Sequence, residues 1–215
     1  FPAFWALRQN GVKDYSTDPN VLAGARFLLK ILSPQDPRDC CLRQHLPIGH
    51  HPYARKAPPL FAWLAAFLKD ADPALAENLM WAWRTVGSPV YQNHDHSGPL
   101  AEPFTRHFVF HDPTIRESPW SLQSENLPHV GAILRSHSES AQESFFFIKA
   151  GRVHSHHDED EGSFHYYGRG VPLAMDGLPL ENGATAAQHN AVTFGQYGQP
   201  SGLIERFAVT PGADY

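Results

Sequence analysis

The sequence has only two cysteines, and these are the adjacent residues Cys40 and Cys41. Two neighbouring cysteines with no other partner make no disulfide framework, and they leave the redox compartment undecided. Basic residues are also few, because 17 Lys and Arg stand against 22 Asp and Glu, for a net charge of -5. This balance excludes a strongly basic surface that would recruit nucleic acid, and a polyanionic ligand would have to be held by a few local cations.

Long hydrophobic runs are lacking as well. The longest uninterrupted apolar stretch is Leu60 to Leu68, whereas a membrane-spanning helix needs about 20 such residues. We therefore expect no membrane partner. The first residue is Phe1 rather than Met, and no signal peptide is visible, so we expect a fragment of a longer chain. Hydrophobic residues still make up 42% of the sequence, which is enough to bury a core.

The first part of the chain has the pattern of helices. Asp18 is a suitable cap for a helix with Pro19 at its first position, and apolar residues follow at helical spacing. Several prolines then predict a loop, and a second helix is expected from about 58 to 69. A third begins at Asp72-Pro73 and ends at Gly87. We expect the last two to pack as an antiparallel pair.

From about residue 128 the pattern changes to short strands. They are rich in β-branched or aromatic residues and are separated by turn residues; the predicted strands are 130–135, 144–148, 163–167, 171–175, 191–194 and 203–209. This spacing predicts an antiparallel β-sandwich. The predicted fold is therefore α+β with two domains: residues 1–127 are helical with a connecting loop, and 128–215 form a truncated sandwich.

Histidines gather in this second part. His154 and His156 are two residues apart and point the same way on an extended chain. Asp176 and His189 stand at two further strand ends, where the loops of a sandwich converge. Imidazoles with a carboxylate suit a divalent metal, most commonly zinc. The alternative is a solvated acidic loop with incidental histidines, which is the more frequent explanation of an isolated His-x-His.

At these positions the sequence resembles the heparinase II/III-type polysaccharide lyases. The motifs similar to the family's sandwich are His154-Ser-His156-His-Asp158, Gly162-Ser163-Phe164, Gly170-Val-Pro172-Leu173-Ala-Met-Asp176 and His189-Asn190, with Leu127 to Ser136 as the opening strand. Upstream, Asp36-Pro-Arg38 and Leu46-Pro47-Ile-Gly49 resemble the last helices of the family's (α/α) toroid. The resemblance spans nearly the whole chain and implies C-terminal helices of a toroid followed by the sandwich.

The resemblance also implies a role for each motif residue. His154 would face the substrate, and His156, Asp176 and His189 would bind Zn²⁺. We expect this zinc to brace the loop that carries His154, because an elimination needs no activated water. The implied substrate is a uronate-containing polysaccharide, and a secreted or periplasmic location is suggested by the family alone.

Eliminative cleavage removes the proton at C5 of a uronate and expels the oxygen at C4. It needs a base, an acid and a partner that neutralises the carboxylate. In the resembled family a tyrosine of the toroid works with the sandwich histidine, and Tyr15 is our candidate, with Tyr53 as the alternative. An aromatic residue at an interface is an equally good explanation of Tyr15. Arg55 and Arg135 are candidate cations for the substrate carboxylate, and surface charges are the alternative.

The sequence departs from the family's pattern at one place, and two other functions fit parts of it. Glu159-Asp160-Glu161 resembles a short acidic insertion, expected to shift His154 and to add negative charge near the site. The runner-up is a cupin-type metal-dependent oxygenase or sugar-binding protein, because His154, His156 and Glu161 fit part of the first cupin motif. A third possibility is a non-catalytic carbohydrate-binding fragment. Because much of the toroid is missing, we expect the isolated chain to show little lyase activity.

Overall fold

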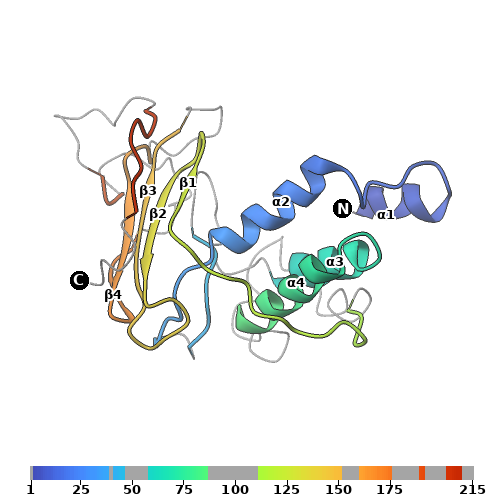
Figure 1. Ribbon diagram of the computed structural model, residues 1–215, viewed down its shortest axis with the longest axis horizontal. Helices are drawn as coiled ribbons and strands as arrows, with labels where there is room; N and C mark the ends of the chain where they lie inside the picture. Colours follow the sequence, from blue (N-terminus) through green and yellow to red (C-terminus); the bar gives the residue numbers. More distant parts are fainter. Residues whose placement is uncertain are drawn as a thin grey trace, which may run out of the picture. The chain divides into compact units, whose positions relative to one another are not determined.

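The computed structural model describes residues 2–38, 41–46, 58–86, 111–151, 160–175, 189–191 and 202–209. The chain divides into two compact units. The first comprises residues 1–31 and 56–121 and contains the helices, and the second comprises residues 32–55 and 122–215 and contains the sheet (Figure 1). The fold is therefore α+β. Residues 32–55, which the sequence analysis grouped with the helices, belong to the unit that contains the sheet.

Four helices are described in the first unit: α1 (Pro2–Gln9), α2 (Pro19–Lys30), α3 (Pro58–Leu68) and α4 (Pro73–Thr85). Two of them begin at an aspartate cap followed by proline. The Asp18 carboxylate accepts a hydrogen bond from Asn20 N at 2.9 Å, and that of Asp72 accepts one from Leu75 N at 3.1 Å. Each cap satisfies an N–H that has no partner inside the helix, and both predicted helix starts are confirmed.

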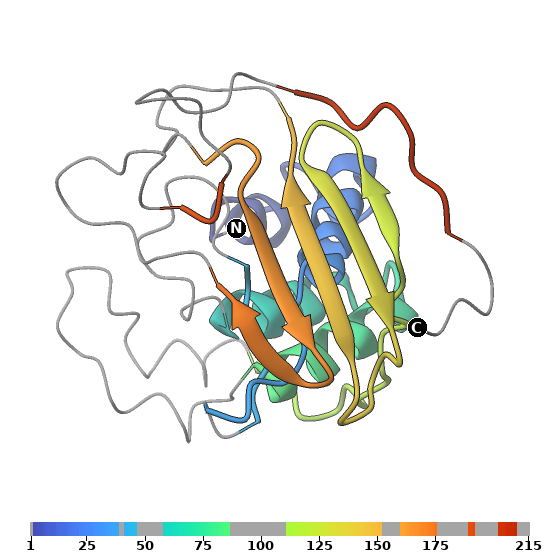
Figure 2. The same cartoon turned by 90° about the vertical axis from the view of Figure 1, so that its left-hand side faces the viewer.

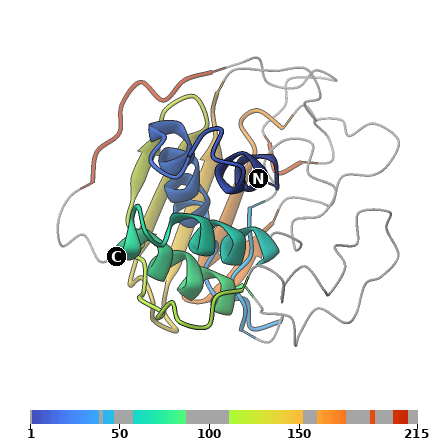
Figure 3. The same cartoon turned by 90° about the vertical axis from the view of Figure 1, so that its right-hand side faces the viewer.

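Helices α3 and α4 form the core of the helical unit (Figure 3). They are joined by the short turn Lys69–Asp72, and Leu64, Leu68 and Leu79 between them are fully buried. The expected pairing of these two helices is confirmed. Within the described ranges, no helix combines the length and the apolar character that crossing a membrane requires.

The sheet of the second unit has five antiparallel strands in sequence order (Figure 2): β1 (Glu125–Leu127), β2 (Gly131–Ser136), β3 (Ser144–Lys149), β4 (Phe164–Gly168) and β5 (Val171–Ala174). Four of the predicted strands are confirmed. β1 was not predicted, and it forms because its backbone pairs with β2. The described residues comprise this one sheet, so the second layer of a sandwich stays a prediction.

The strand predicted at 203–209 is wrong. Residues 202–209 are described and have no strand structure, and Leu203 and Val209 are 61% and 52% exposed. Strand propensity reflects packing on a pleated surface. These residues have the composition of a strand, but among the described parts of the chain no neighbouring strand pairs with them. The strand predicted at 191–194 lies almost entirely outside the described residues.

One face of the sheet is buried. Arg135, Phe145 and Tyr167 lie opposite one another on β2, β3 and β4. The Arg135 guanidinium lies 4.4 Å from the centre of the Phe145 ring, whose edge meets Tyr167. On the other face, Leu134 and Tyr166 are 44% and 39% exposed. This alternation is the period-two pattern of a strand with one buried side.

An irregular hairpin, residues 32–46, belongs to the same unit as the sheet. Isolated bridges pair Leu32 with His45 and Asp36 with Leu42. The resemblance placed Asp36 and Arg38 with the last helices of the toroid; in the structure they lie in this hairpin, where the Asp36 carboxylate accepts from both the backbone and the side chain of Arg38. The helical expectation is thus corrected, and the loop that the prolines predicted is confirmed.

A buried carboxylate joins the hairpin to the sheet. Glu143 binds Arg43 at 3.1 Å and Arg135 at 2.8 Å, and 3% or less of each of these side chains is exposed. Arg43 also donates to the carbonyl of Ser33 at 2.8 Å, and Arg135 donates to that of Leu32. Burial lowers the pKa of Arg135 to about 10, which leaves the group charged at neutral pH.

Glu143→Gln should destabilise the sheet unit by about 3 kcal/mol or more, because it leaves two buried guanidinium groups without their counter-charge. Urea denaturation of the variant and the wild type measures this loss. The matched control is Glu139→Gln in the exposed part of the same turn, which should change stability by no more than about 0.5 kcal/mol. Equal losses in the two variants would contradict the assignment.

Candidate functional site

The predicted site residues are only partly described. His154, His156, Asp176 and Arg55 lie outside the described residues, as does the alternative Tyr53. Tyr15, Arg135 and His189 lie within them. No group of three or more potential metal ligands occurs among the described residues. That finding does not bear on the predicted zinc set, since only one of its three members is described.

The described segments that flank residues 152–159, and the one that precedes residues 176–188, lie at one end of the sheet. Ile148 near the end of β3 pairs with Phe164 at the start of β4. Ala174 at the end of β5 pairs with Tyr166, also near the start of β4. The chain therefore leaves β3 towards His154 and His156, and leaves β5 towards Asp176, at the same end of the sheet.

His189 is attached to this end as well. The next residue, Asn190, accepts a hydrogen bond from Phe164 N at 3.1 Å through its backbone carbonyl. Its side-chain amide donates to Phe164 O at 3.3 Å. These two bonds hold the half-buried His189 beside the first residue of β4. Sequence reasoning singled out the His-Asn pair, and the structure gives the asparagine a backbone-pairing role.

A charge cluster closes the base of the segment that carries His154 and His156. The Lys149 ammonium binds the carboxylate of Asp160 and lies 3.2 Å from that of Glu161. Glu161 also accepts a hydrogen bond from Gly151 N at 3.1 Å. Asp160 and Glu161 are each 1% exposed. We call Lys149, Asp160 and Glu161 the lysine clamp, because it joins the two described ends of the segment.

The lysine clamp corrects one expectation from the sequence. The acidic insertion was expected to add negative charge near the site, but two of its three carboxylates are buried against an ammonium group. Glu159, the third, lies outside the described residues. Lys149 was not predicted as a site residue. The one sign of its role is that it occupies a buried position of β3, a strand in which buried and partly exposed residues alternate.

Gly151 allows the backbone after β3 to pass very close to the backbone of His129. A Cβ at this position would lie 2.1 Å from the carbonyl oxygen of His129, which no side chain can tolerate. Next to it, Ala150 N donates to Val130 O at 3.0 Å. The segment carrying His154 and His156 thus starts from a position fixed by the turn between β1 and β2.

His165 belongs to the core rather than to the set of predicted ligands. It is 0% exposed, lies opposite Phe147 in the register of β3 and β4, and has its ring 6.1 Å from that of Phe147. It was one of five histidines that cluster in the sequence. At this position of β4 the side chain of His165 lies on the buried face of the sheet, so His165 is a core residue.

The two other described candidates are engaged in local contacts. Arg135, a predicted substrate cation, has 1% of its side chain exposed and belongs to the Glu143 cluster, so we leave it out of the proposed binding site. Tyr15, the predicted toroid tyrosine, is half-buried and stacks on Phe4 with ring centres 4.6 Å apart. The Lys13 ammonium lies 4.4 Å from the centre of the Tyr15 ring.

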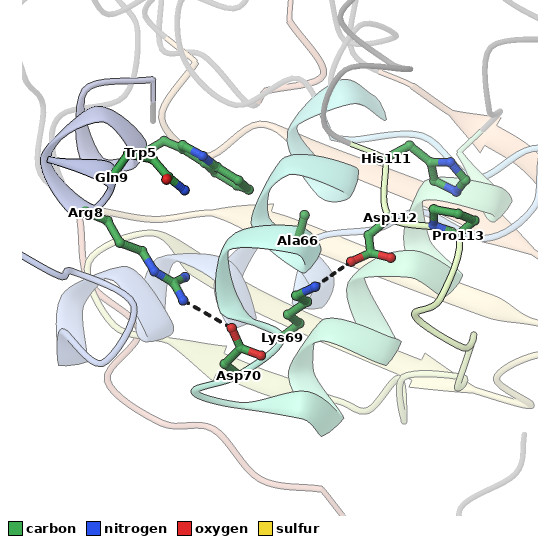
Figure 4. A pocket seen from close by; sticks show the side chains of 9 residues that line it. All are labelled: Trp5, Arg8, Gln9, Ala66, Lys69, Asp70, His111, Asp112 and Pro113. Carbon is green, nitrogen blue, oxygen red and sulfur yellow. Dashed lines mark hydrogen bonds and ion pairs between the residues drawn. The ribbon is translucent and has the colours of Figure 1, made fainter. Parts of the chain in front are cut away.

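The helical unit contains a separate pocket of about 410 Å³ (Figure 4). Residues of α1, of the end of α3 with its turn, and of the segment 111–113 line it. Two ion pairs lie along it: Arg8 with Asp70 at 3.1 Å and Lys69 with Asp112 at 2.7 Å. The hydrogen bond from Lys69 and those from Thr114 lower the pKa of Asp112 to about 2.

Comparison with known proteins gives a likeness of fold. No family model matches the chain, and no curated protein does. The structure of a heparinase III gene product matches with a TM-score of 0.50 at 14% identity, over 82% of this chain and 24% of that one. A second structure of that product, with methylated lysines, matches with a TM-score of 0.40 at 15% identity, over 84% of this chain and 33% of that one.

The fold of this chain is therefore heparinase-like, and the chain spans about a quarter of the length of the first matching structure.

Removing the ammonium of the lysine clamp should be costly. Lys149→Met leaves two buried carboxylates without a counter-charge, so the free energy of unfolding should fall by about 3–5 kcal/mol. Asp160→Asn alone should also be destabilising. The double variant should lose less than the sum of the two, because the partners share one interaction. Strictly additive losses, measured by urea denaturation, would show that the clamp contributes no coupling.

The pair between Lys69 and Asp112 should make stability depend on pH. A carboxyl whose pKa is lowered stabilises the fold above its ordinary pKa of 3.8, and this contribution is lost as the pH falls through about 2. Asp112→Asn should thus be less stable than the wild type at neutral pH, with a difference that shrinks between about pH 4 and pH 2. A difference that stays constant over this interval, measured by thermal unfolding, would contradict the assignment.

Proposed function

We propose that this chain is part of a polysaccharide lyase that cleaves a uronate-containing glycan by β-elimination. In this proposal the helices belong to an (α/α) toroid, and the sheet is one layer of a β-sandwich. The observation that carries the proposal is the common end of β3, β4 and β5, from which the chain leads to His154, His156 and Asp176 and beside which His189 is held. The heparinase-like fold supports the same function.

The proposal includes a zinc ion bound by His156, Asp176 and His189. Two imidazoles and a carboxylate are a donor set that zinc accepts. The backbone next to His189 is held beside β4 by the hydrogen bonds of Asn190, which restricts where the His189 imidazole can lie. When bound, the metal would hold the loops together and so fix the position of His154. Elimination requires no activated water, and the proposed zinc therefore has a bracing role.

His154 is the proposed proton-transfer group. A base or acid must lie within hydrogen-bond reach of the proton that it moves, and its position must be fixed before the substrate binds. The lysine clamp supports this requirement, since it closes the segment of His154 at both described ends. Tyr15 remains the proposed second proton-transfer residue, and Arg55 the proposed cation for the substrate carboxylate.

The cupin alternative requires Glu161 as a metal ligand, and the structure gives that residue another role. One oxygen of its carboxylate accepts a hydrogen bond from Gly151 N at 3.1 Å, and the other lies 3.2 Å from the Lys149 ammonium. An anion already paired inside the protein is a poor candidate for a metal site. The elimination proposal assigns the carboxylate ligand to Asp176 instead.

The proposed function is tested by separating the roles of His154 in proton transfer and His156 in zinc binding. In the complete protein, His154→Ala should abolish formation of the unsaturated uronate while zinc stays bound. His156→Ala should lose zinc, and activity with it. His137→Ala, in the exposed turn between β2 and β3, is the matched control and should change neither quantity. Metal analysis and the ultraviolet absorbance of the product measure both.

Two outcomes would overturn parts of this account. Equal loss of zinc from the His154 and His156 variants would make His154 a metal ligand, as in the cupin alternative. Binding of a uronate glycan without cleavage by the complete protein would instead favour a non-catalytic carbohydrate-binding role.

A further inference from the structure

The polar side chains of the pocket in the helical unit are hydrogen-bonded to one another and to nearby backbone. Arg8 on α1 donates to the carbonyl of Phe67 at 2.9 Å and to Asp70 at 3.1 Å. Asp112 accepts from Lys69 at 2.7 Å and also from the backbone and the hydroxyl of Thr114, at 2.9 and 2.6 Å. The polar groups are thus held in place by the protein itself, and a ligand would meet a prearranged surface.

The pocket carries no net charge. Its two cations, Arg8 and Lys69, are matched by its two carboxylates, Asp70 and Asp112. His111 also lines the pocket; burial, and to a lesser extent the positive charge of Arg84, lowers its pKa and thus favours the neutral imidazole. An anionic ligand would find no spare cation among these residues and would have to displace a carboxylate that already has its partner.

The same arrangement suits a ligand rich in hydroxyl groups. Each hydroxyl both donates and accepts a hydrogen bond. It is therefore able to accept from Arg8 or Lys69 and to donate to Asp70 or Asp112 without separating either pair. Gln9 adds an amide with both capacities.

The pocket also offers apolar surface. The indole of Trp5 lines one side, and the rings of His111 and Pro113 line another, with Ala66 between them (Figure 4). Trp5 also contacts the buried Phe67, with ring centres 5.9 Å apart and ring planes inclined by 42°. Aromatic rings that are apolar on the face and fixed by packing are suited to the C–H face of a sugar ring. A site of a few hundred cubic ångströms with convergent polar groups falls in the range of small-molecule sites.

We infer that this pocket binds an uncharged sugar unit, with Trp5 as the stacking platform and the two ion pairs as hydrogen-bonding walls. The inference does not depend on the proposed lyase chemistry or on zinc, because it concerns binding by the helical unit alone. It gives the helical unit a carbohydrate subsite distinct from the group that would hold a uronate carboxylate.

The test is a binding experiment on the 215-residue chain with two matched probes. Cellobiose is the neutral disaccharide, and digalacturonate is its acidic counterpart. Saturation-transfer NMR and calorimetry should show weak, millimolar binding of cellobiose and weaker binding of digalacturonate. Trp5→Ala should reduce the cellobiose affinity by about tenfold or more. The control Trp81→Ala removes a half-buried tryptophan of α4 that does not line the pocket, and it should leave the affinity unchanged.

A charge variant tests the electrostatic part without removing the platform. Asp70 has 68% of its side chain exposed, so Asp70→Asn should fold normally while removing one carboxylate from the pocket; Arg8 keeps its second ion pair, with Asp14 at 3.5 Å, and the pocket gains a net positive charge. The preference should then shift several-fold towards digalacturonate. Absence of cellobiose binding by the folded wild-type chain, or equal affinity in the Trp5 and Trp81 variants, would overturn the inference. A failed lyase assay would not affect this result, since no turnover is measured.

Discussion

The candidate site depends on the ammonium group of Lys149, which lies between the carboxylates of Asp160 and Glu161. Charges that are removed from water remain stable only when they are paired and hydrogen-bonded. Here the pairing joins the end of β3 to the chain that enters β4, and it closes the segment between them. The two described ends of the segment that carries the proposed residues His154 and His156 are thereby held together.

The sheet unit contains a second cluster of buried, paired charges, centred on Glu143. Glu143 lies between Arg43, on the hairpin of residues 32–46, and Arg135 on β2. Interactions between residues a hundred positions apart in sequence thus fix the hairpin on the unit that carries the site. One end of the sheet is held by the ion pairs of Lys149, and the hairpin is held to the sheet by those of Glu143, so both places support the strands from which the proposed site residues follow.

Local signals were predictable from the sequence, and long-range partners were not. The helix starts at Asp18 and Asp72 were found because a cap acts within three residues of itself. β1 was missed because Glu-Asn-Leu has little strand preference of its own and forms by pairing. The residues predicted as a strand at 203–209 have high strand propensity, but they do not form a strand in the structure. For the site, spacing picked out histidines and a carboxylate, but it could not show that Lys149 supports their segment, because its partners are set by the fold.

The helical unit adds a pocket whose paired charges leave it neutral, while the sheet unit carries the proposed elimination chemistry. The central claim is that this chemistry is elimination. It is tested most directly by digesting uronate polysaccharides with the complete protein and counting new reducing ends against new double bonds. The account predicts one unsaturated uronate for each new reducing end. New reducing ends without ultraviolet absorbance would mean hydrolysis and would contradict it.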